Sequence, residues 1–200
     1  MIHRARAALR LALLGALVSG CYAGESRAVS PQRASALAAD PAWTFARDVP
    51  FVAQQSDSDC GPAALAMVLG HFGVPASLAE VVAADPPRDG GVRAGDLRDV
   101  ARAKGLSAFV VAGTFADLFE QVGRGRPVLV GLAKPMTAGR ALAHYEVVVA
   151  VDRRDHRLLT LDPARGLSEN SMEAFAREWA PTGRVTLIVF RPGADGGGAS

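Results

Sequence analysis

The sequence predicts an α+β fold, in which helices of the first half of the chain pack on an antiparallel sheet formed by the second half. Two observations support this prediction. Apolar residues at helical spacing dominate the first half of the folded region, whereas short apolar runs separated by polar turns dominate the second half. The 200 residues are 50% hydrophobic and 21% charged, which suits one packed domain and excludes a fibrous or wholly disordered chain.

A central buried helix is expected to begin near Pro62, because proline suits the first turn of a helix, and to end at Gly73. Its apolar residues recur on one helical face: Ala64, Leu65, Val68, Leu69 and Phe72.

Two shorter helices follow. The run Ser77-Leu78-Ala79-Glu80 is a capping-box pattern that opens a helix ending before Pro86. A third helix is expected over residues 96–104, where Gly105 stops it.

The second half is expected to be mainly strands. Thr114 and Asp117 cap a helix that runs to Val122, and a last helix is expected over residues 172–179. The predicted strands are 106–111, 126–132, 143–152, 158–162 and 185–191, with the polar turn 153–156 joining the third and fourth as an antiparallel hairpin.

Residues 1–20 have the layout of a bacterial export signal. Arg4, Arg6 and Arg10 precede the apolar run 11–18, with no acidic residue among them. That run is too short for a stable membrane span, which needs about 20 apolar residues. Removing the segment takes three of the 22 basic residues and none of the 20 acidic ones, so the formal charge changes from +2 to −1.

The signal ends in Val18-Ser19-Gly20-Cys21, which looks like the lipobox of bacterial lipoproteins. Cys21 is then the lipidated first residue of the mature chain, and the protein is exported and anchored by lipid to a bacterial membrane, facing the periplasm. The alternative is ordinary signal cleavage a few residues later, with no role for Cys21.

Four segments are therefore predicted. Residues 1–20 are a lipoprotein signal peptide, 21–46 a flexible tether, 47–192 the folded domain and 193–200 a Gly-rich disordered tail. The first strand-like segment of the domain is 49–53.

Several functions are disfavoured by composition. The basic residues are scattered, so no nucleic-acid partner is indicated. Two cysteines and four scattered histidines show no zinc-ligand spacing, and Gly123-Arg124-Gly125-Arg126 lacks the Lys-Ser/Thr of a phosphate-binding loop. We therefore expect neither a metal nor an organic cofactor.

Cys60 is a candidate nucleophile. It precedes Gly61 and Pro62 at the start of the expected central helix, where unpaired N–H groups and the helix dipole stabilise a thiolate. Gly61 leaves room for a substrate backbone. The alternative is a buried, inert cysteine that acts as a small hydrophobe.

His144 and Asp162 are candidates for the base and its orienting group. His144 begins one strand of the predicted hairpin and Asp162 ends the other, so both return to the same open end. In a Cys-His-Asp arrangement, histidine takes the thiol proton and the aspartate fixes the ring. Glu146 shares a face with His144, but its position two residues along one strand is poor for a hydrogen bond to the ring.

Gln54 lies six residues before Cys60 and has an amide that can donate to an oxyanion. Taken singly, each of these residues also has an ordinary structural interpretation: a core histidine, a turn aspartate, a solvated glutamine. Asp57, close by, is expected to be a solvated loop acid.

Together these residues resemble one family. The stretch 54–67, from Gln54 through Cys60-Gly61-Pro62, is similar to the Gln-to-Cys-Gly signature of the bacteriocin-processing cysteine peptidases that cut after double-glycine leaders. His144-Tyr145 with its valine run, and Leu161-Asp162-Pro163 with Gly166, resemble that family's histidine and aspartate blocks. The resemblance covers residues 49–191.

The resemblance implies a papain-like fold with Cys60 as nucleophile, His144 as general base and acid, Asp162 as orienting residue and Gln54 in the oxyanion hole. We therefore expect a lipid-anchored cysteine peptidase that acts on a peptide or protein through a thioester, at Gly-Gly-like sites. Two alternatives remain open: an acyl or peptidyl transferase with the same triad, and a non-catalytic peptide-binding module.

Overall fold

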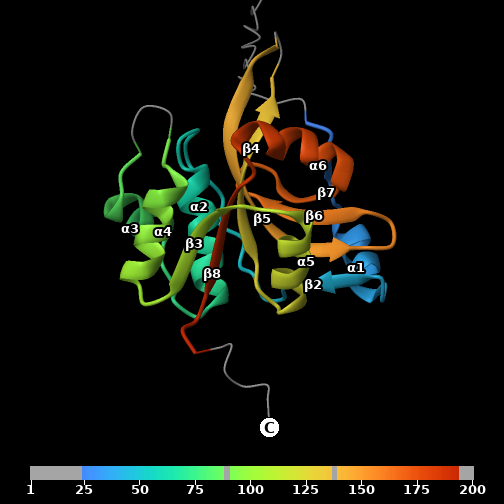
Figure 1. Cartoon of the computed structure of the whole chain (residues 1–200), viewed down its shortest axis with the longest axis horizontal. Helices are drawn as coiled ribbons and strands as arrows, with labels where there is room; N and C mark the ends of the chain where they lie inside the picture. Colours follow the sequence, from blue (N-terminus) through green and yellow to red (C-terminus); the bar gives the residue numbers. More distant parts are fainter. Residues whose placement is uncertain (1–23, 88–90, 137–138, 194–200) are drawn as a thin grey trace, which may run out of the picture.

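The computed structural model describes residues 24–87, 91–136 and 139–193, and it has the predicted α+β architecture (Figure 1). The described strands form one eight-stranded sheet in the order β1-β7-β6-β5-β4-β8-β3, and β2 also pairs with β5. All of the strand pairs in the described residues are antiparallel. The predicted signal peptide, Cys21 and all but the first residue of the predicted tail lie outside the described residues.

The first half of the domain supplies three helices, as expected. Helix α2 (Cys60–His71) is buried over its first ten residues and is the central helix, while α3 (Leu78–Ala84) and α4 (Ala94–Ala103) pack beside it. The capping box that opens α3 is formed in both directions between Ser77 and Glu80. Helix α2 begins two residues earlier than predicted, so Cys60 belongs to its first turn.

The second half contains the strands and two further helices. The predicted hairpin is present, and Thr114 and Asp117 form the predicted cap of α5. Strand β7 was not predicted, because its sequence Gly-Leu-Ser-Glu-Asn-Ser is polar. The elements are β3 (Ser107–Ala112), α5 (Phe115–Gly123), β4 (Val128–Pro135), β5 (Ala141–Asp152), β6 (Arg157–Asp162), β7 (Gly166–Ser171), α6 (Met172–Trp179), the 3-10 turn η2 (Ala180–Thr182) and β8 (Val185–Phe190).

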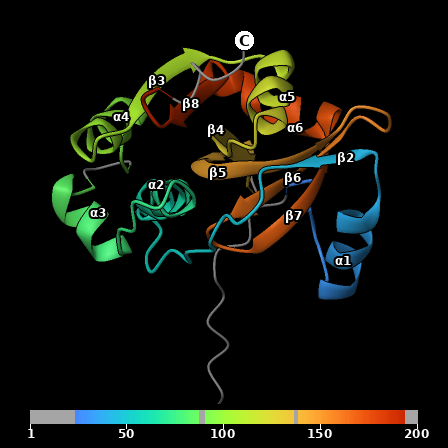
Figure 2. The same ribbon diagram turned by 90° about the horizontal axis from the view of Figure 1, so that it is seen from below.

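Helices cover both faces of the sheet, with α2 on one face and α5 and α6 on the other (Figure 2). Each face has its own apolar core. Val147 and Val149 of β5 join the core under α2, whereas Val148 joins the core under α5 and α6. A continuous valine run is therefore buried on both faces, because successive side chains of a strand point to opposite sides. Strand β5 is the centre of the fold.

The N-terminal segment corrects the predicted tether. Residues 24–46 contain β1 (Arg27–Ala28), α1 (Pro31–Ala39) and β2 (Trp43–Phe45), which pair with or lie against the domain. Leu37 and Trp43 are buried, and Arg33 forms an ion pair with Glu169 of β7. The helix was missed because Leu37 is its one large apolar residue, too few for a helical period.

Segment 49–53 is not a strand, which is a second correction. It follows Asp48, whose φ of 59° turns the chain, and Phe51 within it is half exposed. None of the helices in the described part of the chain has the length and apolar character that a membrane crossing requires.

Candidate active site

Cys60 lies at the first position of α2, with its side chain only 7% exposed. The N-cap residue Asp59 makes no side-chain capping bond, and the first main-chain donor with a helical acceptor is Ala63, which bonds to the Asp59 carbonyl. The N–H groups of Cys60 and Gly61 therefore have no acceptor within the helix, and Pro62 has no N–H. The positive end of the helix thus faces the sulfur and any anion formed beside it.

His144 and Asp162 meet at one end of the β5–β6 hairpin, as the sequence predicts. The Nε2 atom of His144 lies 2.8 Å from Oδ1 of Asp162, and both side chains are almost fully buried. Asp162 Oδ1 also accepts a 2.8 Å hydrogen bond from the Ala164 main-chain N–H. The turn after β6 therefore fixes the carboxylate, and the carboxylate fixes the imidazole ring.

The protonated form of His144 is favoured. Burial lowers the pKa of this imidazole, but the hydrogen bonds to Asp162 and Cys60, with the charges of Glu146 and Asp162, outweigh burial and raise the pKa to about 9. An imidazolium at neutral pH is the natural partner of a cysteine thiolate. The site can thus hold a thiolate-imidazolium pair.

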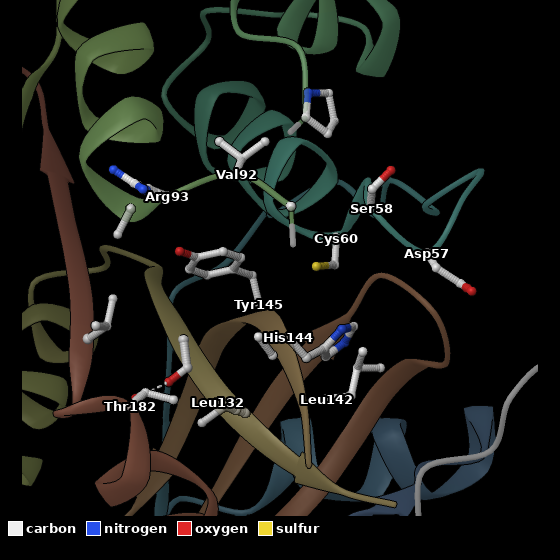
Figure 3. A pocket seen from close by; sticks show the side chains of 16 residues that line it. Asp57, Ser58, Cys60, Val92, Arg93, Leu132, Leu142, His144, Tyr145 and Thr182 are labelled. Carbon is white, nitrogen blue, oxygen red and sulfur yellow. Dashed lines mark hydrogen bonds between the residues drawn. The ribbon is translucent and has the colours of Figure 1, made fainter. Parts of the chain in front are cut away.

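A cavity of about 900 Å³ opens beside these residues (Figure 3). Its wall comes from the start of α2, from the segment before α4, from β4 and β5, and from the turn before β8. Val92 and Arg93, from the segment before α4, and Leu142 of β5 are among the residues that line it. Asp57 is exposed and in a turn, as expected of a solvated loop acid, and it also lies at the wall of the cavity.

Tyr145 is a functional candidate that sequence reasoning did not single out. Its ring lines the cavity next to Cys60 (Figure 3). The ring also packs against two glycines, Gly61 and Gly131. A Cβ atom added to Gly61 would lie 3.1 Å from Tyr145 Cδ2, and one added to Gly131 would lie 3.3 Å from Cε1. Burial and the nearby Cys60 raise the pKa of Tyr145 to about 12, so the phenol stays neutral.

Gln54 lies on the Asp162 side of the site, where its main-chain N–H donates to the carbonyl of Pro163 at 3.1 Å. Gln54 is not among the described residues that line the cavity. Its Oε1 atom is buried and has no hydrogen bond from the described part of the chain. Its oxyanion role therefore stays a prediction.

Lys134, Glu146 and Glu178 form a buried charged group that the sequence analysis did not find. Lys134 Nζ lies 2.5 Å from Glu146 Oε1 and 2.7 Å from Glu178 Oε2. Burial lowers the pKa of Lys134, but the two carboxylates outweigh it and raise the pKa above its usual value. One feature of the sequence could have pointed to this group: a lysine and a glutamate lie within two mainly apolar strand sequences. Charged residues are rarely buried unless they are paired, so each of the two calls for a partner.

Glu146 also lies near the candidate catalytic residues. One ligand atom each from His144, Glu146 and Asp162 lie within 4.8 Å of one another, and all three side chains are buried. These donor types suit a metal ion, but the Lys134 ammonium already contacts Glu146 and Asp162 holds His144. These side chains are therefore better described as residues that pair with one another and with Lys134 than as the ligands of a metal centre.

Comparison with known proteins identifies the relatives of this chain. The model of the peptidase C39 family matches residues 48–192. An uncharacterized protein of Methanothermobacter marburgensis is 32% identical over 145 residues, covering 72% of this chain and 92% of that protein. An uncharacterized protein of Methanothermobacter thermautotrophicus is 33% identical over 145 residues, covering 72% of this chain and 91% of that protein.

Solved structures with the same fold include the peptidase domain of Streptococcus ComA, a bifunctional ABC transporter involved in a quorum-sensing pathway. It is 25% identical with a TM-score of 0.60, and the match covers 72% of this chain and 99% of that domain. A C39-like peptidase from Bacillus anthracis is 18% identical with a TM-score of 0.61, covering 74% and 98%. A double glycine motif protease from an AMS/PCAT transporter, solved with its leader peptide, is 23% identical with a TM-score of 0.57, covering 74% and 96%.

Proposed function

This chain belongs to the peptidase C39 family and is a cysteine peptidase, and we propose that it cleaves peptide bonds with Cys60, His144 and Asp162 as its catalytic triad. The observation that carries this proposal is the 2.8 Å bond between His144 and Asp162, in a site where the same imidazole is hydrogen-bonded to Cys60. Three residues far apart in the sequence thus form one hydrogen-bonded set, of which Cys60 and His144 line the cavity.

The proposed reaction proceeds through a thioester. The Cys60 thiolate attacks the carbonyl carbon of the scissile bond, and His144 gives its proton to the leaving amine. The neutral imidazole then takes a proton from the water that attacks the thioester, and the sulfur departs as a thiolate, which restores the thiolate-imidazolium pair. Asp162 keeps Nε2 occupied, so the other ring nitrogen remains the one that exchanges protons.

The oxyanion is expected to lie at the start of α2. The N–H groups of Cys60 and Gly61 are donors without a helical acceptor, and Gln54 is the predicted side-chain donor. Loss of one such donor costs about 10²–10³ in kcat in other acyl-transfer enzymes. Gln54→Ala removes the side-chain donor and is expected to lower kcat. Gln54→Glu places a carboxylate, which can only accept, at the same position, and a lower kcat than in Gln54→Ala would show that the position faces a negative charge.

Cleavage after small residues of the Gly-Gly type is the proposed specificity. Tyr145 and Cys60 both line the cavity, and the Tyr145 ring packs closely against Gly61 and Gly131, so we expect a bulky ring rather than open space at this part of the wall. The substrate is expected to be a peptide or protein whose residues next to the cut have little or no side chain. A peptide library varied at the two positions before the cut tests this, and preference for bulky residues there would contradict it.

A lipid anchor on Cys21 is proposed from the sequence before it. Because Glu25, four positions after Cys21 in the sequence, forms an ion pair with Arg177 of α6, the link between lipid and domain would be only a few residues long. The domain would then act close to an exported face of a bacterial membrane. Metabolic labelling with palmitate, lost in Cys21→Ala, tests the anchor, and unchanged labelling would contradict it.

Alkylation tests the triad without knowledge of the substrate. The mature protein is treated with iodoacetamide across pH, together with Cys60→Ala and His144→Ala. The proposal expects Cys60 to react as a thiolate well below pH 8.5, and His144→Ala to remove that reactivity. An ordinary thiol, unaffected by His144→Ala, would contradict the triad. A turnover assay with added amines separately tests the transferase alternative, because products of aminolysis would then form faster than products of hydrolysis.

A further inference from the structure

A buried group of three charges lies directly behind the proposed triad. Lys134 comes from β4, Glu146 from β5 and Glu178 from α6, and their side chains are 0%, 0% and 7% exposed. The lysine ammonium bridges the two carboxylates at 2.5 and 2.7 Å. With two acids and one base, the group carries a net charge of −1 when all three are ionised.

Stability alone does not explain such a group. Removing two carboxylates and an ammonium from water costs several kcal/mol per ion, and apolar residues of similar volume often serve a core as well or better. An apolar cluster surrounds this group under α5 and α6, where Leu132, Phe175 and Trp179 are buried. The buried charges are therefore better explained by their electrostatic effect on a neighbouring residue.

The neighbour of this group is His144. Glu146 and His144 lie two residues apart on β5, so both side chains leave the strand on the same face. One carboxylate oxygen of Glu146, one ring nitrogen of His144 and one carboxylate oxygen of Asp162 lie within 4.8 Å of one another. No described residue donates a hydrogen bond of good geometry to either Glu146 oxygen, although Lys134 Nζ is close enough to Oε1 for an ion pair.

We propose that Glu146 is a positioning residue for His144, whose negative charge, held in place by Lys134 and Glu178, favours the imidazolium and through it the Cys60 thiolate. The inference rests on the proposed function, in which Cys60 and His144 react as a pair. Glu146 acts by its field and touches neither the sulfur nor the substrate.

Other charged groups around His144 do not replace this contribution. Asp162 of β6 acts on the same imidazole through a direct hydrogen bond, and Cys60 of α2 lies on its other side. Tyr145 stays neutral, while Asp57 and Arg93, on the cavity wall, are exposed and screened by water. The charge of Glu146 is one of the causes that raise the pKa of His144 to about 9.

The experiment compares Glu146→Gln with Glu178→Gln. Each variant removes one carboxylate charge and one ion pair with Lys134, but only Glu146 lies next to His144. The pH titration of the His144 imidazole is followed by NMR, and the rate of Cys60 alkylation by iodoacetamide is measured at pH 6. Glu146→Asp, which keeps the charge, is the conservative variant.

The expected result is a His144 titration midpoint about one pH unit lower in Glu146→Gln, with slower alkylation of Cys60. Glu178→Gln is expected to shift it by less than about a third as much, because the charge that it removes is farther away. Glu146→Asp is expected to restore most of the midpoint. Equal shifts in Glu146→Gln and Glu178→Gln, or no shift in either, would overturn the proposal.

Two provisions keep the test decisive. If Glu146→Gln does not fold, the triple variant Lys134→Met, Glu146→Gln, Glu178→Gln leaves no unpaired charge in this group, and it is expected to show a smaller downward shift, because loss of the Lys134 charge acts in the opposite direction. An unshifted triple variant overturns the inference. If Cys60 of the unaltered protein reacts as an ordinary thiol, the proposed function fails as well. If Cys60 is a reactive thiolate whose alkylation rate is the same in Glu146→Gln, only the role of Glu146 is refuted.

Discussion

His144 Nε2 lies 2.8 Å from Asp162 Oδ1, across the open end of the β5–β6 hairpin. Asp162 is the last residue of β6 and His144 lies within β5, three residues before Val147, so the register that pairs Val147 with Leu161 brings the two side chains together. The bond is buried, so water competes little for either partner. The orientation of the proposed base is therefore a property of the sheet.

Replacement of Asp162 separates geometry from charge. Asp162→Ala is expected to lower kcat/KM by about 10²–10⁴, because the ring loses both its orienting bond and the charge that stabilises the imidazolium. Asp162→Asn keeps an oxygen acceptor and is expected to lose less. Steady-state kinetics on a cleaved peptide measure both, and equal losses would show that only the charge matters.

The pH dependence follows from His144. Its pKa is raised to about 9, so the imidazolium required by the proposed mechanism persists through neutral pH and is lost as pH rises through about 9. We expect the basic limb of kcat/KM near pH 9, rather than near the ordinary histidine value of about 6.5. In Asp162→Ala this limb should move to lower pH. A wild-type decline centred near 6.5 would contradict the assignment.

The ring of Tyr145 gives a steric prediction. In Gly61→Ala, the new Cβ would meet Tyr145 Cδ2 at 3.1 Å and Leu97 Cδ1 at 3.3 Å, so the ring next to Cys60 must shift. We expect a loss of about 1–3 kcal/mol in the free energy of unfolding and a lower kcat/KM. Gly123→Ala is the matched control, since an added Cβ there meets nothing within 4 Å. Chemical denaturation measures both variants, and a control that loses as much would reject the steric explanation.

Lys134→Met tests the buried charges by stability. Removing the ammonium leaves Glu146 and Glu178 buried without their shared partner, so we expect a loss of about 3–5 kcal/mol in the free energy of unfolding. The triple variant with both glutamates changed to glutamine should recover much of this loss. Urea denaturation measures it, and a triple variant no more stable than Lys134→Met would show that packing rather than charge is responsible.

The N-terminal segment is predicted to be part of the folded unit. Trp43 is 8% exposed and pairs with Asp152 at the end of β5, so Trp43→Ala should cost about 3–5 kcal/mol. Thr44→Ala, at the exposed neighbouring position, should cost less than about 1 kcal/mol. Thermal unfolding measures the difference. Similar melting temperatures for the two variants would restore the interpretation of this segment as a tether.

Local patterns in the sequence account for most of the elements. Capping boxes at Ser77 and Thr114 each involve residues three apart, and the helical period of α2 and the turn between β5 and β6 are equally local. Such patterns predict structure well because all their parts lie within a few residues. The elements that were missed have weak local patterns and are held by distant partners, such as Arg33 with Glu169; they are β1, α1, β2 and β7.

Local motifs were enough to predict the α+β class, the family resemblance and the candidate residues Cys60, His144 and Asp162. What surrounds these residues depends on tertiary packing. Tyr145 packs against two glycines, and Lys134 bridges Glu146 and Glu178. Both sets of contacts join residues from different strands and helices. No local period encodes such contacts, because they arise when the twisted sheet and its covering helices close around one buried volume.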